Sequence, residues 1–185
     1  FLITTFFATA QSLQDGIKLA EREKYESAAI IFRALIAVNP ADAEAYYQLG
    51  KTYSDKENPD SSKIFFNKGV EVGPQSPLNY IGLASLLYAD NKPLDAKAML
   101  DKAIALANVK DSRVLILAAE ASIAGNEKNQ AIDYLNKAIS FDNKNPLVFL
   151  TLGDAWLAKN DGGPALTNYE KAIELNMQCT KAYMR

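Results

Sequence analysis

Two groups of carboxylates stand out as side chains that could perform chemistry. Neighbouring carboxylates act as general acids and bases, and they also bind divalent cations. The two groups consist of Glu21, Glu23 and Glu26, and of Asp55, Glu57 and Asp60. Each group surrounds an expected turn between two helices, where charged side chains are normally solvated. We therefore expect these carboxylates to contribute to solubility rather than to catalysis.

The segment 142–145, Asp-Asn-Lys-Asn, carries oxygen ligands of the kind that bind calcium. It lacks the Gly and the distal Glu of an EF-hand loop, so we interpret it as a turn with a helix cap. The dipeptide 162–163, Gly-Gly, is too short to cradle a phosphate, and no nucleotide-binding motif follows it. The sequence therefore predicts neither a metal site nor a cofactor.

The chain of 185 residues has no histidine and one cysteine, Cys179. Without histidine it has no Ser-His-Asp triad, no Cys-His dyad and no imidazole metal ligand. A single cysteine forms neither an intramolecular disulfide nor a multi-cysteine metal site. Since no histidine activates it, we expect Cys179 to be an inert, partly buried thiol. We find no catalytic constellation and predict that the chain is not an enzyme.

Composition narrows the function classes further. The net charge of -2 and the dispersed Lys and Arg residues disfavour nucleic-acid binding, which requires a basic face. The 49% share of hydrophobic residues excludes intrinsic disorder. Beyond the N-terminal stretch, no apolar run approaches the ~18 residues of a membrane span.

The first ten residues, Phe-Leu-Ile-Thr-Thr-Phe-Phe-Ala-Thr-Ala, carry no charge. An apolar run that ends in small residues is typical of a secretory signal peptide and its cleavage site. We therefore expect residues 1–10 to be a signal-peptide remnant and the protein to be exported to the periplasm or cell envelope of a Gram-negative bacterium. Gln11 stands where a lipoprotein would carry Cys, so no lipid anchor is expected. The alternative is an apolar cap on the first helix and a cytoplasmic location.

The elements that position these residues are helices, whose ends are marked by Pro, Asn and Gly. Ser76-Pro77 and Asn145-Pro146 each combine an N-cap residue with a proline in the first helical turn. Helix-breaking residues recur between the expected helices, at 58–59, 91–93, 125–126 and 161–164.

Similar residues also recur at a spacing of 34. The pairs are Gly16 and Gly50, Ala28 and Ser62, Phe32 and Phe66, and Pro40 and Pro74. The most complete unit reads Tyr-Tyr-Gln-Leu-Gly-Lys-Thr-Tyr over 46–53 and continues to Phe66 and Pro74. This unit resembles the tetratricopeptide repeat, a 34-residue pair of helices, A and B, with such residues at set positions.

The resemblance implies an all-α, right-handed solenoid of about five helix-turn-helix repeats over residues 11–179. The expected repeats are about 9–42, 43–76, 77–110, 112–145 and 146–179, and 180–185 would begin a truncated sixth. The fourth repeat requires one inserted residue near Asp111 and is the most degenerate, because Ser122 replaces an aromatic residue. In the third repeat, Asn108 replaces the closing proline.

Small and large residues alternate in a way that suits paired helices. Small residues let helices A and B approach closely. They include Gly50, Gly153, Ala28, Ala96, Ala131 and Ala165. Large residues such as Tyr53, Phe66, Trp156 and Tyr169 are expected to fill the space that remains.

In this family, helix A of each repeat lines a concave groove that holds a peptide. The resemblance places eleven residues of this chain there: Tyr47, Lys51, Ile81, Ser85, Tyr88, Ile116, Glu120, Ile123, Leu150, Asp154 and Leu157. Leu13, Ile17 and Ser54 occupy equivalent positions. Because Lys51 is the only basic residue among them, a clamp for a peptide carboxylate is not expected.

The predicted groove is largely apolar. Exposed apolar stripes usually mark binding surfaces, so we expect an amphipathic helix or apolar segment, with Glu120 and Asp154 selecting basic flanks. The alternative is that these residues pack on neighbouring helices A.

We predict a non-catalytic scaffold that binds a protein or peptide, with no nucleic acid and no membrane span. Two alternatives remain open: a targeting or regulatory arm of a larger enzyme extending beyond residue 185, or a self-associating homo-oligomeric module.

Overall fold

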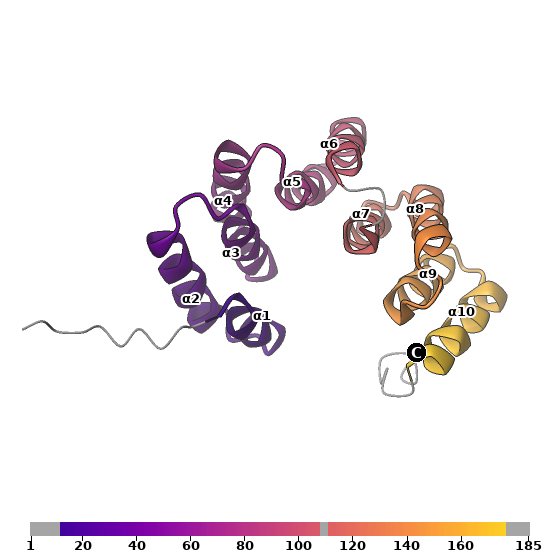
Figure 1. Cartoon of the computed structure of the whole chain (residues 1–185). Helices are drawn as coiled ribbons and strands as arrows, with labels where there is room; N and C mark the ends of the chain where they lie inside the picture. Colours follow the sequence, from indigo (N-terminus) through magenta and orange to yellow (C-terminus); the bar gives the residue numbers. More distant parts are fainter. Residues whose placement is uncertain (1–11, 108–110, 177–185) are drawn as a thin grey trace, which may run out of the picture. The chain divides into compact units, whose positions relative to one another are not determined.

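A computed structural model describes residues 12–107 and 111–176 (Figure 1). In these residues the only regular elements are ten α-helices, which confirms the predicted all-α fold. Their bounds are α1 (Leu13–Glu21), α2 (Tyr25–Val38), α3 (Ala43–Asp55), α4 (Pro59–Val72), α5 (Pro77–Ala89), α6 (Pro93–Leu106), α7 (Ser112–Ala124), α8 (Lys128–Phe141), α9 (Pro146–Ala158) and α10 (Gly162–Leu175). The expected signal remnant 1–10, Asn108, Cys179 and the expected sixth repeat at 180–185 lie outside the described residues.

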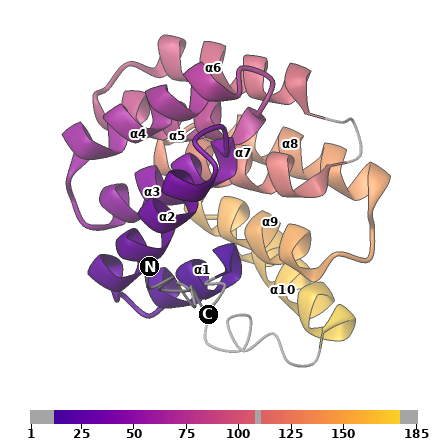
Figure 2. The ribbon, with the colours of Figure 1, turned by 60° about the vertical axis from the view of Figure 1, so that its left-hand side comes forward.

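The chain forms two compact units, Phe1–Gly82 (unit 1) and Leu83–Arg185 (unit 2), and their boundary falls within α5. The odd-numbered helices are the first of each pair (helix A), and the even-numbered helices are the second (helix B). In unit 1, α3 packs on both α2 and α4, and α1 packs on α2 and α3 (Figure 1). In unit 2, α7 packs on α6, α8 and α9, and α9 packs on α8 and α10 (Figure 2).

Five of the described helices, α1, α3, α4, α7 and α9, begin at a side-chain cap. Asn58 and Asn145 accept hydrogen bonds from backbone N–H groups of α4 and α9, and a proline follows each of them. Asp142 ends α8, and its carboxylate accepts a hydrogen bond from the backbone N–H of Lys144 at 3.1 Å. The segment 142–145 is therefore a turn with a helix cap, as the sequence predicted.

Each turn from helix A to helix B contains one non-glycine residue in the left-handed region, with φ between 57° and 64°. These residues are Glu23, Glu57, Asn91, Asn126 and Asn160. In the second pair, the N–H of Glu57 donates to the carbonyl of Ser54 and the N–H of Asn58 to that of Tyr53, both at 2.9 Å. Such bonds satisfy the last carbonyls of a helix. Successive left-handed residues lie 34 positions apart, except that Asn91 and Asn126 lie 35 apart. The additional residue falls in the interval that contains the expected insertion near Asp111.

In unit 1, glycines on helix A face aromatic rings on helix B. A Cβ built on Gly50 would lie 2.6 Å from the ring of Phe66, which is 2% exposed. Gly16 lies in the same way against Phe32. A larger residue at either glycine would force the two helices apart, so this close approach agrees with the expected role of Gly50.

Among the described residues of unit 2, the same arrangement is found once, between Gly153 of α9 and Tyr169 of α10. The pair α7–α8 carries Ala119 and Leu135 at the corresponding positions, and both are fully buried in one hydrophobic cluster. A slightly larger residue on helix A is thus matched by a smaller one on helix B.

The degenerate fourth repeat is completed by a side chain from the preceding helix A. Ser122 of α7 is fully buried, and its hydroxyl donates to the carbonyl of Ala118 at 2.8 Å. The ring of Tyr88 in α5 lies against Gly125, where an added Cβ would overlap it. Since Ser122 leaves room beside α7, we interpret Tyr88 as filling the space of the missing aromatic residue.

Candidate functional site

The eleven predicted groove residues fall into three rows, each of which takes one position from successive helices A. Row 1 contains Tyr47, Ile81, Ile116 and Leu150; row 2 contains Lys51, Ser85, Glu120 and Asp154; row 3 contains Tyr88, Ile123 and Leu157, with Ser54 at the equivalent position of α3. The three rows differ in burial.

Row 1 is buried throughout, with exposed fractions between 3% and 7%. Ile116 belongs to the hydrophobic cluster formed by α7, α8 and α9. Leu150 belongs to a second cluster with Ala165, Tyr169 and Ala172 of α10. The expected alternative was packing on neighbouring helices A. Ile116 has such a neighbour, α9, in its cluster, whereas Leu150 packs on helix B of its own pair.

Row 2 is polar and accessible. Lys51 and Glu120 are exposed, while Ser85 and Asp154 are partly buried. The ammonium of Lys51 pairs with the Asp55 carboxylate at 2.7 Å. The Asp154 carboxylate accepts a hydrogen bond from the Tyr169 hydroxyl at 2.9 Å, and burial raises the pKa of Tyr169. This bond fixes the Asp154 side chain against α10.

Row 3 changes from buried to exposed within unit 2. Tyr88 is 9% exposed because it lies in the space beside α7. Ile123 is partly buried against the hydrophobic cluster formed by α7, α8 and α9. Leu157 is 50% exposed. Leu157 also lies one helical turn from Asp154, so the two side chains share one face of α9.

Beneath Tyr88, a short polar chain links α5 to α8. The Tyr88 hydroxyl donates to the Gln130 carbonyl oxygen at 3.3 Å, and the Gln130 amide donates to the Tyr134 hydroxyl at 2.5 Å. Burial raises the pKa of Tyr134 to about 12, although the hydrogen bond from Gln130 opposes this shift. Both tyrosines are therefore neutral at physiological pH and act as packing and hydrogen-bonding groups.

The described residues contain neither a cluster of metal ligands nor a helix that could span a membrane. In 12–107 and 111–176, no three acidic or cysteine side chains come together in a way that would hold a metal ion. None of the helices in this part of the chain combines the length and the apolar character needed to cross a bilayer.

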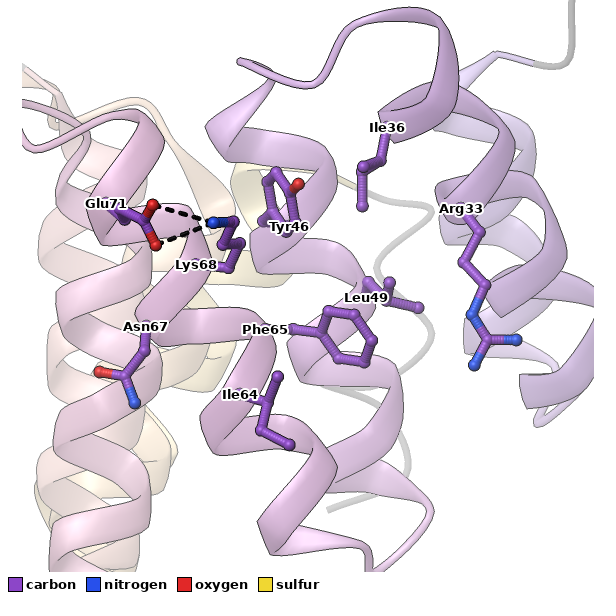
Figure 3. A pocket seen from close by; sticks show the side chains of 9 residues that line it. All are labelled: Arg33, Ile36, Tyr46, Leu49, Ile64, Phe65, Asn67, Lys68 and Glu71. Carbon is purple, nitrogen blue, oxygen red and sulfur yellow. Dashed lines mark hydrogen bonds and ion pairs between the residues drawn. The ribbon is translucent and has the colours of Figure 1, made fainter.

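The sequence reasoning missed one groove in each unit, both lined mainly by helix B. In unit 1, side chains of α2 and α4 surround a groove of about 560 Å³ that Tyr46 and Leu49 of α3 also line (Figure 3). In unit 2, residues of α6 and α8 line a groove of about 490 Å³. One sequence signal pointed to the helix-B surface of unit 1: isoleucine recurs 34 residues apart at Ile30 and Ile64. Both side chains are exposed, and Ile64 lines the groove of unit 1.

Two models of the tetratricopeptide repeat match this sequence, one over residues 43–75 and the other over 81–146, which is together more than half of the chain. The chain belongs to the tetratricopeptide repeat family. The matched residues include α3 and α4, most of α5, and α6 to α8, and the fold is typical of protein-interaction scaffolds.

Similar proteins include subunits of two complexes. The chain is 29% identical to anaphase-promoting complex subunit 3 of Schizosaccharomyces pombe over 94% of its own length and 26% of that protein. It is 26% identical to the formate-dependent nitrite reductase complex subunit NrfG of Escherichia coli O157:H7, over 58% of this chain and 55% of NrfG. The chain thus spans about a quarter and about half of these curated relatives.

A solved structure shows the same fold along nearly the whole chain. The tetratricopeptide repeat protein TTC0263 of Thermus thermophilus superimposes with a TM-score of 0.76 at 21% identity, covering 94% of each chain. At this identity, the likeness describes the fold of the repeats alone.

Proposed function

We propose that this chain is a non-catalytic scaffold that binds a peptide or helix of a partner protein on the helix-A face of its repeats. The observation that carries the proposal is the sorting of the three rows by burial. Row 1 provides a buried support, while rows 2 and 3 keep accessible side chains that the packing of the repeats does not bury. We name the accessible residues of rows 2 and 3 on α7 and α9 the α7–α9 face: Glu120, Ile123, Asp154 and Leu157.

The chemistry of the α7–α9 face favours an amphipathic partner. Leu157 and Ile123 offer apolar contact area, and Glu120 and Asp154 contribute negative charge on the same helices. An apolar segment with basic flanking residues would match both features, since charge complementarity selects partners and apolar anchors supply affinity.

The partner proposed here is a component of a larger assembly. Both curated relatives are named as subunits of complexes, which supports a role in holding proteins together. The uncharged, apolar stretch 1–10 supports the further proposal that this assembly lies in the bacterial cell envelope. Fractionation of cells that produce the full-length protein tests this part: recovery in the cytosol would contradict it.

Site-specific photocrosslinking tests the binding face. A photoreactive amino acid is placed at Leu157 on α9 or at Leu166 on α10, which are 50% and 59% exposed. The proposal expects a crosslinked partner from position 157 and much less from position 166. Equal crosslinking from both positions, or crosslinking from position 166 alone, would contradict it.

A further inference from the structure

The groove of unit 1 combines apolar walls with charged edges. Side chains of Ile36, Leu49, Ile64 and Phe65 line it, and Ile64 is 64% exposed (Figure 3). Its volume of about 560 Å³ lies within the range of sites that hold side chains or small ligands. The groove lies on a different set of residues from rows 1 to 3, apart from its contact with α3.

Arg33 at the edge of this groove contacts the side chain of Tyr53. Its guanidinium donates a hydrogen bond to the Tyr53 hydroxyl and lies 5.7 Å from the centre of the Tyr53 ring. The Tyr53 ring in turn stacks on Phe65, with centroids 5.3 Å apart and an interplanar angle of 14°. A guanidinium ordered in this way loses less entropy when it binds a further group.

The charge of Arg33 is not matched inside the groove. The other lining cation, Lys68, is paired with both carboxylate oxygens of Glu71 at 2.9 Å. Arg33 donates to the Tyr53 hydroxyl. Its charge also acts on Glu26, which lies outside the groove lining and pairs with Lys56; Lys56 is the main cause that lowers the pKa of Glu26, and Arg33 contributes less. Because a guanidinium has five N–H donors, it retains the capacity for a two-point contact with a carboxylate.

The corresponding groove of unit 2 has the opposite charge. Its lining includes Asp101, Glu127 and Asp133, and its one cation, Lys97, pairs with Asp101 at 2.8 Å. A carboxylate would be repelled there, so the two grooves are not equivalent docking surfaces.

We propose that the groove between α2 and α4 docks a partner protein segment in which an apolar side chain stands next to an acidic residue. The apolar side chain packs on Ile36, Ile64 and Phe65, and the carboxylate binds the Arg33 guanidinium. This surface consists of residues that belong neither to rows 1 to 3 nor to the α7–α9 face.

Nuclear magnetic resonance titration of the full chain tests this inference with two capped tetrapeptide probes. The acidic probe is Ac-Asp-Leu-Phe-Asp-NH2 and the basic probe is Ac-Lys-Leu-Phe-Lys-NH2. We expect the acidic probe to shift backbone amides in 30–36 and 61–68 and to bind about tenfold more tightly than the basic probe, as a charged hydrogen bond predicts.

Three variants distinguish lost binding from a loss of folding in the same titration. Arg33→Gln should weaken the acidic probe about tenfold, whereas Arg22→Gln, the same change at the exposed C-cap of α1, should leave its affinity unchanged. Ile64→Ala should weaken both probes by a few-fold, about the effect of lost apolar contact. Equal effects of the two arginine variants, equal affinities of the two probes, or shifts confined to helices A would overturn the proposal.

Discussion

The repeat α3–α4 of unit 1 and the repeat α7–α8 of unit 2 fill the same interior with different residues. In α3–α4, Gly50 lies against the ring of Phe66. In α7–α8, Ala119 and Leu135 take these positions and are fully buried. The small and large positions have changed together, so the two repeats conserve the volume of the pair rather than the identity of either residue.

The two repeats also differ in the side chain that occupies one position of helix A, and this difference changes which residues are accessible. Unit 1 has aromatic Tyr53 at the position where α7 has Ser122, and Tyr53 stacks on Phe65 of its own repeat. In unit 2, the ring of Tyr88 lies beside α7, and this removes Tyr88 from the accessible helix-A face. The size of the side chain at position 122 therefore determines whether Tyr88 of the preceding repeat remains accessible for binding.

The largest effect is expected at Ile116 in α7. Ile116→Lys would bury an unpaired charge in the α7–α9 cluster, so it should reduce the free energy of unfolding by about 4 kcal/mol or more. Leu157→Lys on α9 should change it by less than about 1 kcal/mol, since that side chain is half exposed. Urea unfolding followed by circular dichroism provides both values, and equal costs would refute the division into rows.

The next largest effect concerns the matched pair in unit 1. Gly50→Ala should cost about 2 kcal/mol because its Cβ would overlap the Phe66 ring. Phe66→Leu alone should cost about 1 kcal/mol through lost packing. The double variant reproduces the Ala–Leu pair of α7–α8, so it should cost at least about 1 kcal/mol less than the sum of the single variants. Simple additivity would show that the two positions do not compensate each other.

A smaller effect is expected where Tyr88 meets α7. Gly125→Ala should cost about 1 kcal/mol, since the added methyl group would overlap the near end of the Tyr88 ring. Gly162→Ala is the matched control, because a Cβ at Gly162 has no atom within 4 Å. Thermal unfolding should show a lower midpoint for the first variant alone; an unchanged midpoint would mean that Tyr88 does not fill this space.

The smallest effect distinguishes the turns of the two units. Glu57 has φ of 58°, a conformation that costs a side chain about 1 kcal/mol and that glycine adopts freely. Glu57→Gly should therefore stabilise the chain by about 0.5 kcal/mol, and Asn126→Gly by less, because Asn tolerates this region better. Unfolding midpoints in urea compare the two, and a larger gain at Asn126 would contradict the explanation.

The sequence was sufficient to predict the helices, because a 34-residue period combines local signals that act within a few residues. Asn145-Pro146 and the small residue Gly50 were identified in this way. The burial of Tyr88 was not predictable from its own repeat, since it depends on the volume missing at Ser122 of the next one. The groove around Arg33 was missed for a similar reason: its walls come from two helices B, and only their packing brings Arg33, Tyr53 and Phe65 together.

The affinity of the partner for two lysine variants tests the account most directly. Once crosslinking has identified the partner, calorimetry compares Leu157→Lys on the α7–α9 face with Leu166→Lys on helix B of the same repeat. The account predicts that Leu157→Lys weakens binding about tenfold or more while Leu166→Lys leaves the affinity unchanged. Unchanged affinity for Leu157→Lys, in a protein that unfolds at the normal urea concentration, would contradict it.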